Sequence, residues 1–313
     1  MINKTSSTED RIWAVLAHLS ALTFGMGILL PVLGWSDQRR KSNYASFQCL
    51  QALGYQSVGF TVWVLSYLVI IILGSIILLI TLGSTPGSNQ NANTGLSPGL
   101  IIFLIIAFGG FAVYFLLPVI AAVACALGRD FRYPLLGDRL ARYLNFVPPQ
   151  KGEEQAWLNE NHEFRWVVAM GHFSILIILW GMLAPLTAWI LQGKNSLFLK
   201  FQSIQTLAYQ AVTTMIYFVG GFLYLFGMLL LFATMAGIGA PDPNSTTSVV
   251  SIIVLGVLLL IAAVLILIVP LLHILAQWAG YRVLKGEDYR YPLIGRLTER
   301  WSSKHSTIKE KPA

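Results

Sequence analysis

Charged residues are scarce in this chain. Of its 313 residues only 11% are charged and 56% are hydrophobic, and the mean hydropathy is +0.67. Soluble domains usually carry about 25% charged residues. The composition therefore excludes an ordinary soluble domain and predicts an integral membrane protein. No small-residue cleavage site follows a short apolar core near the start, so we expect no cleavable signal peptide.

Groups able to carry chemistry are also scarce. Cys49 and Cys125 are the only cysteines, and both lie in apolar stretches, which excludes a disulfide framework or a zinc site. No His has a second ligand at metal-binding spacing, and no acidic residue has a recognisable nucleophile–base partner. We therefore expect no metal, no cofactor and no enzymatic activity. The sequence contains no nucleic-acid-binding motif.

The chain contains an internal sequence repeat. Eleven residues recur 154 positions later without a gap: Arg11, His18, Ser20, Gly27, Pro31, Trp35, Phe47, Gln48, Gln51, Tyr55 and Gln56 return as Arg165, His172, Ser174, Gly181, Pro185, Trp189, Phe201, Gln202, Gln205, Tyr209 and Gln210. Both copies end alike, at 128–137 and 286–295. This predicts a polar N-terminal segment at 1–10, membrane repeats at 11–147 and 163–301, a linker at 148–162 and a basic tail at 302–313.

The distribution of positive charge predicts the topology. Each copy has three apolar segments, 12–35, 47–82 and 100–127 in the first and 166–191, 201–235 and 249–281 in the second, and the loops 83–99 and 236–248 contain no Lys or Arg. Basic loops stay cytoplasmic. All basic residues lie on one side only if each copy crosses the membrane an even number of times, which places both termini in the cytoplasm of a multi-pass cytoplasmic-membrane protein.

An even number of crossings requires the first segment of each copy to leave on the side where it entered. Twenty-four residues cannot span twice, since one crossing takes about 20, so we expect a broken, re-entrant helical hairpin. The break would lie at Thr23–Gly27 and Pro31, and at Gly181 and Pro185. One spanning helix with a kink is the alternative. The predicted fold is all-α: two tandem repeats, each a re-entrant hairpin, two transmembrane helices and a short amphipathic cytoplasmic helix opened by Pro134 or Pro292.

Polar residues recur inside the apolar segments. Buried amides need hydrogen-bond partners, and helical spacing places Gln48, Gln51 and Tyr55 on one face with Gln56 at its edge. His18 is a further candidate, which could meet the Gln face. The second copy repeats this candidate polar face as His172, Gln202, Gln205, Tyr209 and Gln210. Two interpretations stay open: hydrogen-bonded attachment between helices, or the lining of a polar path.

A second group of residues suits the membrane surface. Arg39, Arg40 and Lys41, together with Arg132 and Arg290, would contact anionic lipid head groups on the cytoplasmic side. Tyr133 and Tyr291 would lie at the interface, with an apolar ring and a wet hydroxyl.

The ordered motifs Trp-Ala-x-Leu-Ala-His-Leu-Ser (13–20), Gly-Ile-Leu-Leu-Pro (27–31), Phe-Gln-x-x-Gln-Ala-Leu (47–53) and Arg-Tyr-Pro-Leu (132–135) resemble a bacterial family of small membrane proteins built on a domain of unknown function. That family is distantly similar to the Tic-twenty component of chloroplast protein import. The resemblance implies an all-helical module with both ends on one side, and no reaction. Most relatives carry one copy, so the fused pair suggests self-association or partnership with other membrane proteins.

Three functions fit these observations. The first is a non-enzymatic translocation, channel-like or scaffold component. The second is an organiser of the lipid surface, and the third is an intramembrane enzyme acting on lipid.

Overall fold

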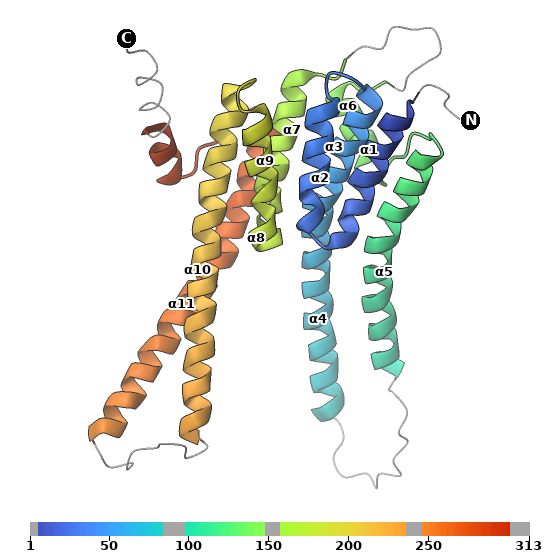
Figure 1. Ribbon diagram of the computed structural model, residues 1–313. Coiled ribbons are helices and arrows are strands. Elements are labelled where there is room, and N and C mark those ends of the chain that lie inside the picture. The colour runs from blue at the N-terminus through green and yellow to red at the C-terminus, as the bar shows by residue number, and fades with distance from the viewer. Residues whose placement is uncertain (1–5, 84–97, 148–156, 236–245, 301–313) are drawn as a thin grey trace, which may run out of the picture.

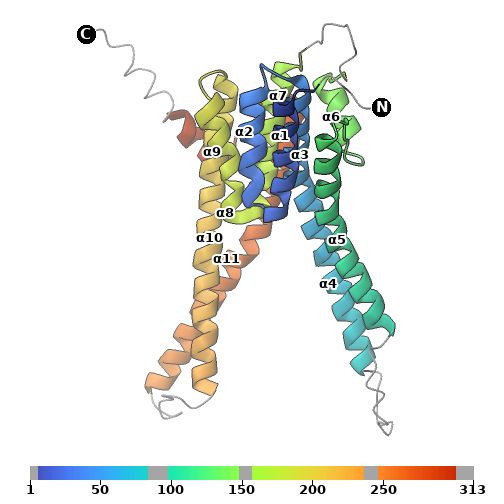
Figure 2. The ribbon, with the colours of Figure 1, turned by 45° about the vertical axis from the view of Figure 1, so that its right-hand side comes forward.

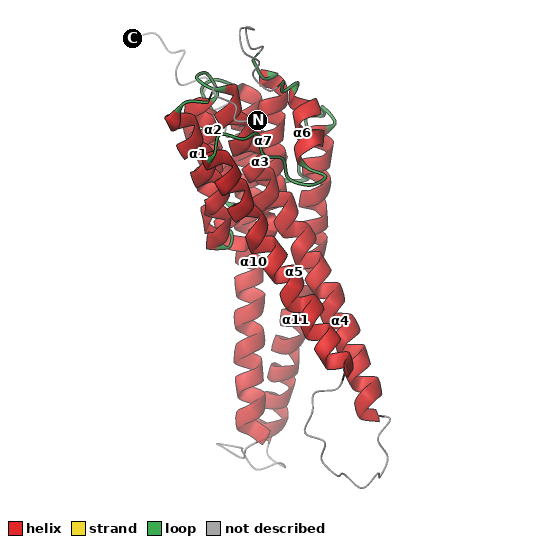
Figure 3. Ribbon diagram, turned by 90° about the vertical axis from the view of Figure 1, so that its right-hand side faces the viewer, coloured by secondary structure: helices red, strands yellow, loops and turns green. Residues whose placement is uncertain are grey.

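The computed structural model describes residues 6–83, 98–147, 157–235 and 246–300, and every regular element within them is helical (Figure 3). The all-α prediction is confirmed. The predicted loops 83–99 and 236–248, most of the linker and the basic tail fall largely or wholly outside the described residues.

The first repeat contains α1 (Thr8–Leu19), η1 (Ser20–Thr23), η2 (Met26–Ile28), α2 (Leu29–Gln38), α3 (Asn43–Gly54), the π-helical η3 (Tyr55–Gly59), α4 (Phe60–Gly83), α5 (Pro98–Ala126) and α6 (Gly137–Leu144). The second contains α7 (Glu160–Phe173), η4 (Ser174–Ile177), α8 (Ile178–Gly181), α9 (Leu183–Gln192), α10 (Leu197–Met235) and α11 (Thr246–Leu284), followed by a helical stretch at 294–300. Ser7 and Asp10 form a capping box, so α1 begins three residues before Arg11.

The first apolar segment of each repeat is a hairpin, as predicted. The Gln38 side-chain amide at the end of α2 donates to Glu9 at the start of α1 over 2.9 Å, so the two ends of the hairpin are adjacent. Arg39 contacts both Gln192 at the end of α9 and Glu163 near the start of α7. The chain therefore enters and leaves the second hairpin at this same end. A single spanning helix in place of the hairpin is excluded in both repeats.

The hairpin turns explain why a glycine recurs in both copies. In the first turn Phe24 and Gly25 have φ of 52° and 95°, which reverses the chain. A Cβ on Gly27 would lie 1.9 Å from the carbonyl oxygen of Ser20, and one on Gly181 would lie 2.1 Å from that of Ser174. Only glycine permits this close approach. Pro31 and Pro185 are not at the break but in the first turn of the returning helix, where the missing N–H is tolerated.

Five helical stretches within the described ranges have the length and apolar composition to cross a membrane: Asn43–Ile76, Ile101–Ala126, Glu160–Gly181, Leu197–Ala233 and Ile252–Leu284. Glu160–Gly181 is mostly buried and turns back at Ile178, so it forms the outgoing arm of the second hairpin. The other four are the long helices of Figure 1, which extend well below the two hairpins packed at the upper end. The chain is an all-α multi-pass membrane protein.

The expected amphipathic helix is present, but it begins later than predicted. Pro134 does not open it: residues 134–136 form a turn in which Leu135 has a φ of 64°, and α6 starts at Gly137. Leu293 repeats this conformation with a φ of 66°. Leu140 and Leu144 are buried while Arg139 and Arg142 are exposed, so α6 has one apolar face and one basic face.

Candidate functional site

The imidazole of His18 joins α1 to two other segments of the first repeat. Nε2 donates to the side-chain oxygen of Gln48 on α3 over 3.0 Å, and the Tyr133 hydroxyl donates to Nδ1 over 3.1 Å. The Gln48 amide nitrogen faces the Asp130 carboxylate and the Phe131 carbonyl, at 3.0 and 3.1 Å, which fixes the direction of its oxygen. His18 is therefore a neutral, fully buried connector between three segments.

Gln51 completes this network one helical turn later. Its side-chain nitrogen donates to the Phe131 carbonyl over 2.9 Å, and its oxygen accepts the Tyr133 backbone N–H over 2.9 Å. The glutamine thus pairs with an extended backbone much as a neighbouring strand would. Gln48 and Gln51 together attach the segment after α5 to α3.

The second repeat builds the same network. Tyr291 lies 2.9 Å from His172, and the side-chain oxygen of Gln202 lies 3.4 Å from the same ring. Gln205 donates to the Tyr289 carbonyl and accepts the Tyr291 N–H, both over 3.0 Å. Both repeats therefore use the repeated residues for the same contacts inside the repeat.

The remaining members of the predicted polar face join the same clusters. Tyr55 stacks on Tyr133 with ring centroids 4.2 Å apart, and Tyr209 stacks on Tyr291 at 3.8 Å. Gln56 donates to Ser20 Oγ over 2.8 Å in the hairpin turn. Gln210 in turn donates to the Gly171 carbonyl over 2.7 Å. All ten predicted residues are buried and take part in such contacts: His18, Gln48, Gln51, Tyr55, Gln56, His172, Gln202, Gln205, Tyr209 and Gln210.

The positions predicted for Tyr133 and Tyr291 at the lipid interface are wrong. Their exposed fractions are 3% and 2%, because each hydroxyl is used by a histidine and each ring by a tyrosine. The signal that could have found this is the shared ending itself. An aspartate four residues before the proline and a tyrosine directly before it recur in both copies, as the partners of a recurring glutamine and histidine should.

A family model matches the chain twice, at residues 9–140 and 163–298. The chain belongs to the MamF/MmsF family, described as the magnetosome magnetite crystal formation protein family. The two matches confirm the tandem duplication of a bacterial membrane module. No curated protein and no solved structure matches the chain. The resemblance to Tic-twenty gains no support from these comparisons.

Beyond what the two family modules share, Arg39 ties them together. Its guanidinium donates to Gln192 and Glu160, each over 2.9 Å, and to Glu163 over 3.4 Å, and lies 4.3 Å from the centre of the Phe164 ring. Its side chain is only 4% exposed. The prediction that Arg39 contacts lipid head groups is therefore wrong.

The other basic residues of the predicted interface are more accessible. Arg40 is 73% exposed and pairs with Glu160, while Lys41 pairs with Asp37 over 2.8 Å. Arg132 bridges Asp130 and Asp138, and Arg290 pairs with acidic neighbours of its own repeat. Contact of these four side chains with lipid stays a prediction.

Trp166 makes a further contact between the modules. Its indole N–H donates to the Leu50 carbonyl over 2.9 Å. The ring lies so close to Gly54 that a Cβ there would be 2.6 Å from it. Neither Arg39 nor Trp166 has a like residue in the other copy, where Gly193 and Ile12 stand. Sequence repetition could not find these two residues, because neither is shared by the copies.

These contacts define what the arrangement can do chemically. His18 and His172 face amides and phenols rather than a carboxylate, and the Thr206 hydroxyl, 3.1 Å from His172, donates to the Gln202 carbonyl over 2.7 Å. Within the described ranges no group of three or more His, Cys, Asp or Glu side chains lies where it could hold a metal ion. The clusters attach helices to one another, and the family description names no reaction.

Proposed function

We propose that this chain is a non-enzymatic membrane scaffold, and that it serves crystal formation, the process in the family description, by organising a membrane. The observation that carries this proposal is that His18, Gln48, Gln51 and their counterparts are 0% exposed and bonded within their own repeat. A side chain that lined a polar path would keep a wet face. Attachment between helices is thus favoured over translocation.

We expect the two loops not to bind the mineral directly. Iron ions and oxide surfaces are hard and prefer oxygen ligands, above all carboxylates. The loops 83–99 and 236–248 contain a single acidic residue, Asp242. The proposed orientation places these loops outside. It places the termini, and the ends of the hairpins where the chain enters and leaves, in the cytoplasm.

Cysteine labelling in intact cells tests this orientation on a Cys-free background. Arg40→Cys and Lys194→Cys stand at exposed, equivalent positions of the two hairpins. An impermeant reagent should leave both unlabelled, and should label cysteines placed at Ser88 and Ser245 in the loops. Labelling of only one of the two hairpin positions would show inverted repeats and would overturn the topology.

The contact between the repeats suggests how a scaffold could extend. α7 packs on α3 of the first repeat, but the corresponding pair, α1 and α10, lies apart (Figures 1 and 2). The contact is only partly symmetric, because α2 packs on its equivalent α9 whereas the packing of α7 on α3 has no counterpart, and such a heterologous component can continue into rings or rows. The free face of α1 carries Ile12, which is 53% exposed, and the free face of α10 carries Met215, which is 68% exposed.

The sizes of the corresponding residues agree with reuse of this contact between chains. Where Trp166 packs over Gly54 inside the chain, the free faces carry the smaller Ile12 and the larger Ala208. Ile12 on α1 is smaller than Trp166, and Ala208 on α10 is larger than Gly54, so the volume lost on one helix is offset on the other. We propose that α1 of one copy packs on α10 of the next.

Cross-linking distinguishes this arrangement from a twofold dimer. In a Cys-free chain carrying both Ile12→Cys and Ile204→Cys, which correspond to Trp166 and Leu50, oxidation in membranes should give a ladder of oligomers. Each single variant should give none. Dimers from a single variant would show a symmetric contact instead, and no cross-links at all would refute the proposed rows.

Flux measurements and microscopy test the scaffold role itself. Proteoliposomes containing the chain should show no more proton or ferrous-ion flux than empty vesicles. A flux abolished by Gln51→Leu would replace the scaffold by a translocation component. In a magnetite-forming bacterium that encodes the chain, deletion should change the crystal size distribution in electron micrographs, and an unchanged distribution would remove the link to crystal formation.

A further inference from the structure

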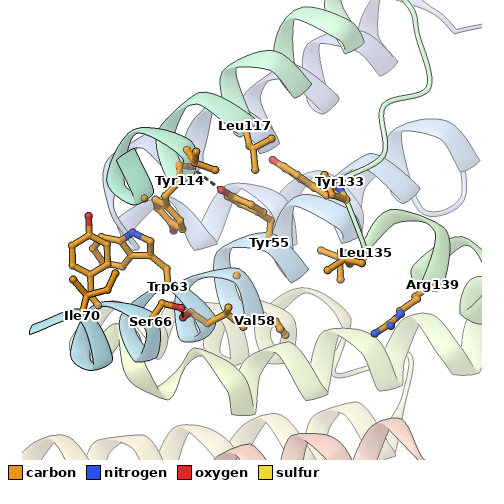
Figure 4. A pocket seen from close by; sticks show the side chains of 17 residues that line it. Tyr55, Val58, Trp63, Ser66, Ile70, Tyr114, Leu117, Tyr133, Leu135 and Arg139 are labelled. Atoms are coloured by element: carbon orange, nitrogen blue, oxygen red, sulfur yellow. Dashed lines mark hydrogen bonds between the residues drawn. The ribbon is translucent and has the colours of Figure 1, made fainter. Parts of the chain in front are cut away.

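A groove of about 620 Å³ runs between α4 and α5 of the first repeat (Figure 4). Trp63 and Tyr67 line it from α4, and Tyr114 and Leu117 line it from α5. Val62 and Val113, also in its wall, are more than half exposed, so the groove opens toward the lipid. Its volume lies in the range of roughly 300–1,000 Å³ that small-molecule sites occupy.

One end of the groove is basic. Leu135, Leu136 and Arg139 close it where the segment after α5 turns into α6. Figure 4 shows the Arg139 side chain at this end, far from Trp63. Arg139 is exposed and forms no ion pair among the described residues, whereas the neighbouring Asp138 is already bound by Arg132 over 2.7 Å. The site thus combines a long apolar wall with an available cation at one end.

We infer that this groove binds one anionic glycerophospholipid. Its acyl chain lies against the aromatic wall formed by Trp63, Tyr67 and Tyr114, and its phosphate accepts hydrogen bonds from the Arg139 guanidinium. The planar guanidinium suits phosphate oxygens because it can donate two parallel hydrogen bonds. The amphipathic α6 holds Arg139 at the boundary where a head group would lie, because Leu140 and Leu144 anchor the opposite face of that helix.

The second repeat lacks this combination, which makes the site a property of one half of the chain. Trp63 and Tyr67 are replaced by Tyr217 and Gly221, and Leu297 stands in the place of Arg139. The carbonyl that accepts the Tyr209 hydroxyl belongs to Leu272, where the first repeat has Tyr114. In the second repeat the long helices α10 and α11 also pack directly against each other.

Glycines show the difference between the two helix pairs. In α10, Gly220 corresponds to Ser66, which lines the groove, and a Cβ on Gly220 would lie 3.1 Å from Leu265 of α11, so the two helices approach closely at this level. In α5, Gly110 lines the groove, and a Cβ there would meet only Tyr67, at 3.7 Å. The first repeat therefore keeps open a space that close packing removes in the second.

Native mass spectrometry of the full chain in detergent tests the assignment, with phosphatidylglycerol or phosphatidylcholine added in increasing amounts. The wild type should show one tight phosphatidylglycerol binding event and no equally tight event with phosphatidylcholine. Arg139→Gln should weaken that event about tenfold, which equals about 1.4 kcal/mol. Arg142→Gln, one turn further along the exposed face of α6, is the matched charge control and should have little effect.

A second pair of variants tests the groove rather than the charge. Gly110→Leu fills the groove and should abolish the tight event. Gly109→Leu adds the same side chain at a neighbouring position with no atom within 4 Å, so it should bind as the wild type does. Equal binding of the two lipids, or equal effects of the two glycine variants, would overturn the proposal. Since Arg139 is exposed, Arg139→Gln keeps the test informative even if Gly110→Leu does not fold.

Discussion

Replacing Gln51 by leucine tests the central claim that the repeated glutamines attach helices to one another. Leucine keeps most of the volume of the side chain but removes its hydrogen bonds to the Phe131 carbonyl and the Tyr133 N–H. The Phe131 carbonyl still accepts from Gln48, so the group left without a partner is the Tyr133 N–H. An orphaned buried donor costs about 1–3 kcal/mol, and each lost bond about 0.5–1.5 kcal/mol. We expect the free energy of unfolding to fall by about 2–4 kcal/mol.

The assay is reversible unfolding in mixed micelles, followed by the fluorescence of the nine tryptophans. Gln205→Leu is the matched variant, because Gln205 makes the same bonds to Tyr289 and Tyr291 over 3.0 Å. The two losses should agree within about 1 kcal/mol, since measured values at equivalent sites still vary with context. A loss below about 0.5 kcal/mol for both variants would show that the networks contribute little. Structural attachment would then no longer explain why these residues repeat.

Three further changes probe the contact between the repeats, the hairpin turn and the carboxylate that faces Gln48. Arg39→Gln leaves Glu163 buried without a cation and should cost about 3–5 kcal/mol, whereas Arg40→Gln, whose side chain is 73% exposed, should cost less than about 1 kcal/mol; equal unfolding energies would contradict the buried tie. Gly27→Ala places a Cβ against the Ser20 carbonyl and should destabilise by about 3 kcal/mol, and Gly109→Ala is its control in size-exclusion chromatography and unfolding. Burial raises the pKa of the Asp130 carboxyl against the opposing effect of Arg132. Because the folded state then holds the proton more tightly, stability should fall as pH rises above the ordinary value of 3.8. Asp130→Asn should flatten that part of the pH profile and change stability at pH 7 by about 1 kcal/mol or less.

The sequence was enough to predict the hairpins because charge and length leave few solutions. The two loops without Lys or Arg have to share one side, and a segment of about two dozen residues cannot cross twice. The glycines of the break then mark the turn. Gln48 and Gln51 could be placed on one face because helical spacing depends only on local geometry.

The partners across the network were harder to find, because they come from distant parts of the chain. Tyr133 was assigned to the membrane surface on residue type alone, since its sequence neighbours Arg132 and Pro134 are typical of such a position. The structure uses the same tyrosine as a buried hydrogen-bond donor to His18, 115 positions away. Propensity describes where a residue type usually lies, whereas a repeated Asp, Tyr, Gln and His set indicates mutual contact in this fold.

The chain enters and leaves each hairpin at the same end, which determines how the two repeats are oriented. Each repeat then ends on the side where it began, so two copies joined by a short linker keep the same orientation in the membrane. Arg39 at the end of one hairpin can therefore meet Glu160 and Glu163 at the start of the next, at the same depth. Inverted repeats would place these groups at opposite ends of the bundle. In the proposed rows, α1 of a further copy would approach α10 in the same orientation, so the packing of α7 on α3 inside the chain would be one step of a repeated contact.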